Sequence, residues 1–233
     1  MPMPAPPPGV TSRKTRKLWL YCWQCASQKG WYVADIDQRR WVPAPAFFRE
    51  GHDRTWWAGF FADRLHGVDA DLARAELIRI YDAIWGHVPC HDALLHAYDP
   101  DRSLLPVCIG IWQVAADWDT MWREFTRVDE TGLIEPPVIE EFPSPHLGTG
   151  RKCLHYVKHK KTGLVVASLD YAFRCEELET DLTLHTHTSD LRRLQRALPD
   201  IDHLARIIKV VDHDQLIAGN AEIAARQDAP GEH

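Results

Sequence analysis

Two cysteines spaced two residues apart are the side chains best suited to bind a metal ion. Cys22 and Cys25 lie at a predicted turn after an aromatic segment, a setting typical of a zinc knuckle because both thiolates can reach one ion. A tetrahedral site needs two further ligands, and His87 and Cys90 form another pair at comparable spacing, with His91 and His52 as substitutes. We therefore predict zinc as the cofactor of a site formed by Cys22, Cys25, His87 and Cys90. Two unrelated cysteines in a hairpin and a redox dithiol are the alternatives.

Two histidines share one face of a predicted strand near the end of the chain. His185 and His187 are two residues apart, so both side chains project to the same side and could share a metal ion or a carboxylate. Thr183 and Thr186 lie around them. Polar residues on the solvated face of a sheet are therefore the simpler interpretation.

Basic side chains gather in the hairpin that precedes these histidines. They are Arg151, Lys152, Lys158, Lys160 and Lys161. Such a hairpin could contact phosphate groups, but Tyr156 is the one aromatic side chain near it that could stack on a base. A solvated hairpin tip is the simpler interpretation, and a DNA or protein partner stays open.

The sequence contains none of the common catalytic motifs. It lacks a glycine-rich phosphate loop, a Gly-x-Ser-x-Gly elbow and a helix with paired metal-binding histidines. Cys153 and His155, or Cys175 near the histidine strand, could form a nucleophile and its base, but a chain with six cysteines and 13 histidines offers many such pairs. We predict no catalytic residue.

Two helices in the middle of the chain follow from the spacing of apolar residues. One runs from Asp69 or Asp71, which would cap it, to about residue 85. Its predicted buried stripe consists of Leu72, Ile80, Tyr81 and Ile84. The other helix covers residues 118–125, where four apolar side chains follow the i, i+3, i+4, i+7 spacing: Trp118, Met121, Trp122 and Phe125.

A meander of antiparallel strands is predicted over residues 151–189. Alternating strands at residues 152–159 and 181–188 enclose the aliphatic strand 164–169, and Ser189 or Asp190 caps a following helix to Leu198. A last helix is predicted over residues 202–211.

The remaining predicted elements are less regular. Strands are expected within residues 91–98 and 104–112, a short buried helix at residues 55–65, and a loop over residues 135–150, which contain four prolines. A hairpin is expected around the cysteines, before residue 36.

The order of elements from residue 118 to residue 198 resembles the ligand-binding domain of MmyB-like transcription regulators, which has a PAS-like fold. The residues that carry the resemblance are Trp122 on its helix, the turn from His159 to Gly163, and the strands at 165–169 and 182–188. Lys160 replaces the proline that the family has in this turn, and no helix-turn-helix lies upstream.

This resemblance implies a sensor domain in which helices and a curved sheet enclose an apolar pocket. In the family, the pocket can hold a fatty-acid-like molecule, and no catalysis is implied. Several tryptophans could line such a pocket, although ordinary core packing gives the same pattern. The ligand-binding residues expected here are Trp118, Met121, Trp122, Phe125, Val166 and Leu184.

The composition is that of a folded protein. Apolar residues make up 45% of the 233 residues and charged residues 26%, which excludes a mainly disordered chain. The net charge of −6 argues against a protein that coats nucleic acid through its overall charge. No apolar run approaches the ~18 residues that would span a bilayer, and the proline-rich start does not resemble a signal peptide, so a cytoplasmic location is expected.

We predict an α+β fold: an antiparallel PAS-like sheet with flanking helices, preceded by a small cysteine-containing hairpin and helices. The predicted segments are a proline-rich arm (1–15), the tryptophan-rich hairpin with its zinc knuckle and helix (16–66), a connecting helix (67–87), the PAS-like domain (88–200), and a C-terminal helix and tail (201–233). The expected function is regulatory sensing of an apolar small molecule, with transcription regulation as one role. A zinc-stapled nucleic-acid or protein binding module and an enzyme of unidentified class are the alternatives.

Overall fold

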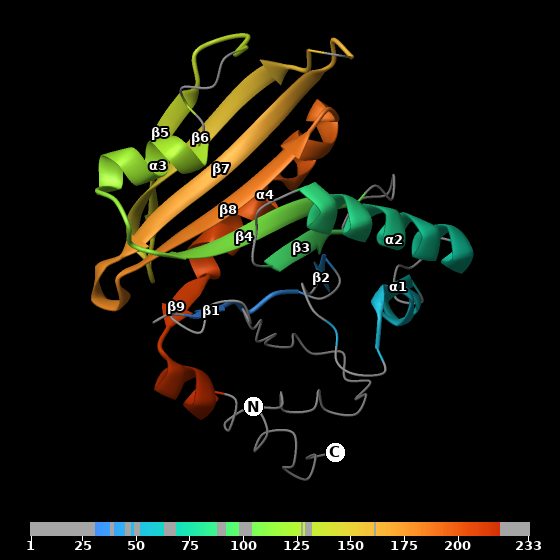
Figure 1. The fold of residues 1–233 in the computed structure, drawn as a ribbon, viewed down its shortest axis with the longest axis horizontal. Coiled ribbons are helices and arrows are strands. Elements are labelled where there is room, and N and C mark those ends of the chain that lie inside the picture. The colour runs from blue at the N-terminus through green and yellow to red at the C-terminus, as the bar shows by residue number, and fades with distance from the viewer. Residues whose placement is uncertain are drawn as a thin grey trace.

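The chain forms a seven-stranded antiparallel sheet with helices on both faces, which confirms the α+β class (Figure 1). The structure is a computed structural model. It describes residues 31–37, 40–44, 48, 52–62, 69–87, 92–97, 104–126, 128, 132–160 and 162–219.

The strand order in the sheet is β2-β3-β4-β8-β7-β6-β5, and all neighbouring strands are antiparallel. The strands are β2 (Trp41–Ala44), β3 (Asp92–His96), β4 (Leu105–Gln113), β5 (Val138–Ser144), β6 (Gly148–Lys158), β7 (Val165–Cys175) and β8 (Thr180–Thr188). A separate two-stranded ribbon pairs β1 (Trp31–Val33) with β9 (Lys209–Val211). The predicted strands within residues 91–98 and 104–112 are confirmed as β3 and β4.

The meander predicted over residues 151–189 is confirmed as β6, β7 and β8. Gly163, at a φ of +70°, lies in the turn between β6 and β7, where glycine adopts a positive φ without strain. Its N–H donates to the His159 carbonyl at 2.8 Å and closes the turn. Most of β7 is buried on both faces, as its aliphatic run predicts for a central strand.

The helices are α1 (Arg54–Ala62), α2 (Ala70–His87), α3 (Trp118–Thr126) and α4 (Leu191–Ile207), with a short 3-10 turn, η1 (Glu176–Leu178), before β8. Residues 213–219 form a further helical segment after β9. Asp69 caps α2 by accepting from the Leu72 N–H at 3.1 Å, and Asp190 caps α4 by accepting from the Arg193 N–H at 2.9 Å. No helix in the described ranges is long and apolar enough to cross a membrane.

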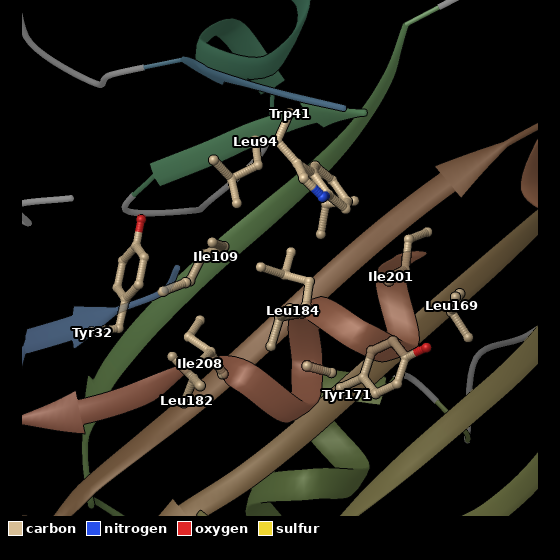
Figure 2. Close-up of a cluster of buried hydrophobic side chains, with 14 of the residues drawn as sticks. Tyr32, Trp41, Leu94, Ile109, Leu169, Tyr171, Leu182, Leu184, Ile201 and Ile208 are labelled. Atoms are coloured by element: carbon tan, nitrogen blue, oxygen red, sulfur yellow. The ribbon is translucent and has the colours of Figure 1, made fainter. Parts of the chain in front are cut away.

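The two faces of the sheet are built differently. Face A, which packs against α4, is apolar, and its core includes Leu94, Ile109, Tyr171 and Leu184 together with Ile201 of the helix (Figure 2). Face B carries α1 and α2 over β2, β3 and β4, and α3 over β7. In Figure 1 none of the described helices covers the stretch of β7 and β8 between α3 and α2 on face B.

Two predictions around the meander are wrong. Residues 135–150 contain β5 and the start of β6 instead of a loop; β5 is the edge strand, where the missing N–H of Pro143 is tolerated. Residues 191–207 form one helix through Pro199 instead of two. Ile201 and Leu204 continue its buried stripe past the proline, and burying them offsets the lost hydrogen bond.

The two N-terminal helices expose apolar side chains that the sequence pattern predicted to be buried. In α1, Trp57 is buried but Trp56 is 47% exposed, because α1 packs against α2 through one side alone. In α2, Leu72 is 69% exposed, whereas Ile80 and Ile84 are buried as predicted. Leu72 lies in the first turn of α2 next to the Asp69 cap.

Candidate functional site

A block of polar side chains lies on face B where β8, β7 and β6 are adjacent. In one row across the strands, His185 pairs with Asp170, which pairs with Cys153. In the next row, His187 pairs with Ser168, which pairs with His155. Since alternate residues of a strand share a face, all six side chains project to the same side of the sheet.

Asp170 is the centre of this block. Its Oδ1 accepts a hydrogen bond from His185 Nδ1, and its Oδ2 accepts one from Ser168 Oγ at 3.1 Å. His155 Nδ1 lies 3.8 Å from Oδ2, and the Asp170 side chain is 4% exposed. A carboxylate this deeply buried is stable as an ion when hydrogen bonds and positive or polar partners replace its water. The geometry supplies these partners from both neighbouring strands.

A hydrogen-bonded chain leads from Asp170 to the protein surface. A carboxylate accepts hydrogen bonds, so the Nδ1–H of His185 donates to Asp170, and Nε2 of the same ring faces His187. That Nε2 lies 3.2 Å from His187 Nδ1, so the two rings share a hydrogen bond. The His185 side chain is 25% exposed and His187 is exposed. This chain of hydrogen bonds therefore connects solvent to the buried carboxylate of Asp170.

Cys153 and His155 are close, but they do not form a reactive pair. The Cys153 Sγ atom lies 3.8 Å from His155 Nδ1, and both residues are buried. Burial raises the pKa of Cys153 to about 12, and the negative charge of Asp170 adds to this rise. The thiol therefore stays protonated near neutral pH and cannot supply a thiolate nucleophile.

An aromatic wall, formed by Trp112 of β4 and Phe125 of α3, lies beside this block. Gly110 of β4 leaves room for the Trp112 indole, whose Nε1 would lie 2.4 Å from a Cβ atom placed on that glycine. The indole donates to Thr183 Oγ1 at 3.1 Å and packs against Phe125 of α3, with ring centroids 5.3 Å apart. Thr183 precedes His185 by two residues on β8, so the wall adjoins the histidine chain on the same face.

Two arginines from the sheet hold α3 on face B. The guanidinium of Arg174 lies 5.8 Å from the Trp118 ring, and that of Arg151 lies 5.6 Å from the Trp122 ring. Arg174 also forms a bidentate ion pair with Asp181 and donates to the Ala116 carbonyl at 2.9 Å. These contacts fix the start of α3 relative to β7 and β8.

Most of the predicted ligand-binding residues come together on face B. Met121 and Trp122 are buried against the sheet, and Trp118 and Phe125 pack beside them. Val166 lies on the same face of β7, since it is in phase with Asp170.

Leu184 is the exception among the predicted ligand-binding residues. It lies in the core of face A against α4, on the opposite side of the sheet from α3. The sequence pattern could not show on which face of the sheet Leu184 lies, because β8 is buried on both faces over much of its length.

The predicted metal site cannot be located. Cys22, Cys25 and Cys90 lie outside the described residues, and His87 ends α2 with a side chain that is likewise not described. Within the described ranges, no group of three or more His, Cys, Asp or Glu side chains is arranged to hold a metal ion. Zinc at the cysteine pair therefore stays a prediction.

The sequence interpretation missed Asp170 because it ended the strand at Leu169. A signal was present: an ionisable residue interrupts the aliphatic and aromatic run that continues to Phe173. The sheet register, which the sequence does not reveal, places this carboxylate opposite His185. The shared carboxylate considered for the two histidines is thus present, bonded directly to His185 and through it to His187.

No protein-family model matches the chain, and no curated protein matches it significantly.

Proposed function

We propose that the protein binds a small organic molecule on face B, over β8 and β7 between α3 and α2, and acts as a ligand-sensing regulatory domain. The observation that carries this proposal is the chain from buried Asp170 through His185 to exposed His187, beside the wall formed by Trp112 and Phe125. A binding site of this kind combines an apolar lining with a few convergent polar groups.

The energetics of the sheet favour a functional role for these polar residues. Replacing a buried charged pair with well-packed apolar residues is often neutral or stabilising, by about 1 to 4 kcal/mol. Face A of the same strands is apolar, with Leu169 and Tyr171 flanking Asp170 in sequence. These strands can therefore be built from apolar side chains without a carboxylate, and this favours a functional role for Asp170.

The composition of the site narrows the chemistry of the ligand. The aromatic wall suits an apolar body, whereas His185 and His187 suit a carboxylate or hydroxyl group at one end. We therefore propose an amphipathic ligand rather than a wholly apolar one. The resemblance to MmyB-like ligand-binding domains, with their fatty-acid-like ligands, supports this class, and a PAS-like form of the sheet is part of the same proposal.

A thermal-shift screen with medium-chain carboxylic acids and alcohols tests the proposal. Ligands of the folded state raise Tm according to RT ln(1 + [L]/Kd). We expect a bound acid to raise the Tm of the wild-type protein, and the shift to disappear in His185→Ala. His203→Ala is the matched control, because His203 is exposed on α4, which packs on the other face. Equal shifts in the two variants would exclude face B as the binding site.

A further inference from the structure

We propose that the protein forms a two-fold symmetric dimer through an apolar patch on face A, which packs against the same patch of a second copy. The patch lies where β5, β6 and β7 are adjacent beside α4. It consists of Ile134, Val138, Leu154, Tyr156, Val165 and Leu191. The patch is on the opposite side of the sheet from the proposed ligand site, so this inference goes beyond that function and does not depend on it.

The patch begins where the core of face A reaches the edge of the sheet. Val138 of β5 pairs in register with Leu154 of β6, which pairs with Leu169 of β7. Leu169 is buried in the core of face A, and Leu154 is half-buried against that core. Val138 is 57% exposed. Burial therefore decreases along this row towards the edge strand, and apolar surface is left open to solvent.

The exposed apolar surface continues towards the turn between β6 and β7. Tyr156 is half-buried against the same core, and Ile134, whose N–H donates to the Tyr156 carbonyl at 2.9 Å, is 51% exposed. Val165, at the start of β7, is 38% exposed. In Figure 1 the turn between β6 and β7 projects beyond the end of α4. Single exposed apolar residues are ordinary, but contiguous apolar patches mark interaction sites.

The helix α4 borders the patch with two leucines. Asp202 is on the side of α4 that faces β6, because its carboxylate lies 3.0 Å from Lys152 Nζ. Leu198 and Leu191 precede Asp202 by four and eleven residues, so they lie along the same side of the helix. Leu198 is half-buried against the core, whereas Leu191 is 43% exposed. The open surface therefore extends from the sheet onto the helix.

The two ends of the patch carry opposite charges. Lys158 is exposed at the end near the turn between β6 and β7. At the other end, Lys152 Nζ lies 3.0 Å from a Glu140 oxygen and 3.0 Å from an Asp202 oxygen, so two carboxylates surround one ammonium group. The Glu140 side chain is 53% exposed. Arg206 lies one row farther from the patch, over an aromatic ring of β5. One end thus presents a cation and the other a carboxylate.

This charge distribution makes the patch complementary to a second copy of itself. Lys158 is six residues along β6 from Lys152, which pairs in register with Glu140, and this is about 20 Å in an extended strand. A two-fold axis between the rows of Leu154 and Tyr156 therefore brings Lys158 of each chain to Glu140 of the other. The contact has the same residues on both sides, as in most homodimers, with an apolar centre and a charged rim.

The edge of the sheet is less suitable for a dimer contact than this patch. Antiparallel pairing of two β5 strands about their centre would place Glu141 opposite Glu141 of the second copy, and like charges directly opposite each other are destabilising. Pro143 also lacks the N–H group that pairing requires. The second copy is therefore expected on face A beside α4.

Sedimentation velocity of the full-length protein at micromolar to submillimolar concentrations tests the proposal. We expect the mass of two chains of 26.7 kDa. Val138→Asp should raise the dissociation constant of the dimer by about 100-fold or more, because two carboxylates would be desolvated in each dimer. Leu72→Asp is the matched control, since Leu72 is 69% exposed on α2, and it should dimerise like the wild type. A monomeric wild type, or a Val138→Asp dimer as stable as the wild-type dimer, would overturn the proposal.

Charge reversal tests the two-fold arrangement itself. Lys158→Glu alone and Glu140→Lys alone should each raise the dissociation constant by about 10-fold or more, because each places like charges together at both ends of the contact. In an equal mixture of the two variants, the heterodimer regains an opposite-charge pair at each end. It should therefore form about as well as the wild-type dimer. A mixture no more associated than its separate components would rule out this arrangement.

A measurement on the wild-type protein covers the case in which a variant does not fold. Carbodiimide joins lysines to carboxylates that are in direct contact, and an equal mixture of ¹⁴N- and ¹⁵N-labelled chains shows which links join two chains. Since about 20 Å separates Lys158 from Glu140 within one chain, a link between them should carry both labels. Mixed-label links confined to other residues would contradict the proposed dimer.

Discussion

The aromatic wall of the site makes a sharp prediction about one glycine. In Gly110→Ala the new Cβ atom would lie 2.4 Å from Trp112 Nε1 and 2.6 Å from Thr183 Oγ1, closer than real Cβ contacts. The indole must therefore move. Its hydrogen bond to Thr183 contributes about 1 kcal/mol, and its contact with Phe125 about 0.5 to 1.5 kcal/mol. We expect the free energy of unfolding to fall by about 2 kcal/mol in total.

Gly59→Ala is the matched control for this prediction. Gly59 lies inside α1, and a Cβ atom there would make an ordinary contact at 3.6 Å with Arg74 Nε. Alanine in a helix interior is favoured over glycine by about 0.5 to 1 kcal/mol, so this variant should be slightly more stable than the wild type.

Urea denaturation followed by far-UV circular dichroism measures both variants, and thermal unfolding gives a second reading. For a chain of this length about 1 kcal/mol corresponds to roughly 2 to 4 °C in Tm. A Gly110→Ala protein as stable as the wild type would show that Trp112 does not lie over Gly110. The wall beside His185 would then have to be abandoned.

Three further predictions concern residues around the sheet. Asp181→Asn should lower the free energy of unfolding by about 3 kcal/mol in urea denaturation, because it leaves the Arg174 guanidinium, which is 11% exposed, without its carboxylate. Glu76→Gln is the control: it removes an exposed partner of Arg79 and should change the free energy of unfolding by less than about 0.5 kcal/mol. Burial lowers the pKa of His96 below 6.5 in the folded protein, so the unfolded chain takes up a proton first as the pH falls. The free energy of unfolding should therefore decrease as the pH drops below about 6.5. His96→Gln should flatten this pH dependence in urea titrations at several pH values. Cys153, buried and with its pKa raised to about 12, should resist iodoacetamide at about pH 8 until the protein unfolds, as peptide mass spectrometry would detect.

Much of the fold could be predicted from local patterns. The aliphatic run that begins at Val165 and the turn at Gly163 identify two strands of the meander, and Asp190 identifies the start of α4. The prolines misled the prediction in β5 and α4, because tolerance of a proline depends on whether its strand is at an edge and on what the helix buries beyond it. Neither property is local in sequence.

The candidate site could be predicted in part. The spacing of His185 and His187 correctly predicts both side chains on one face, and the helix predicted over residues 118–125 is confirmed as α3. The partner of the histidines depends on the register between β7 and β8, which brings residues 15 positions apart into contact. The burial of Asp170 beneath the two histidines depends on the packing of the whole sheet, so a local sequence pattern does not predict it.

The most direct test of the account is histidine side-chain NMR of the wild-type protein during a titration with sodium octanoate. If the molecule binds on face B, the ring signals of His185 and His187 should shift with a common saturation curve, and the signal of His203 on α4 should stay in place. Saturable binding that leaves the His185 and His187 signals unchanged would contradict the proposed site.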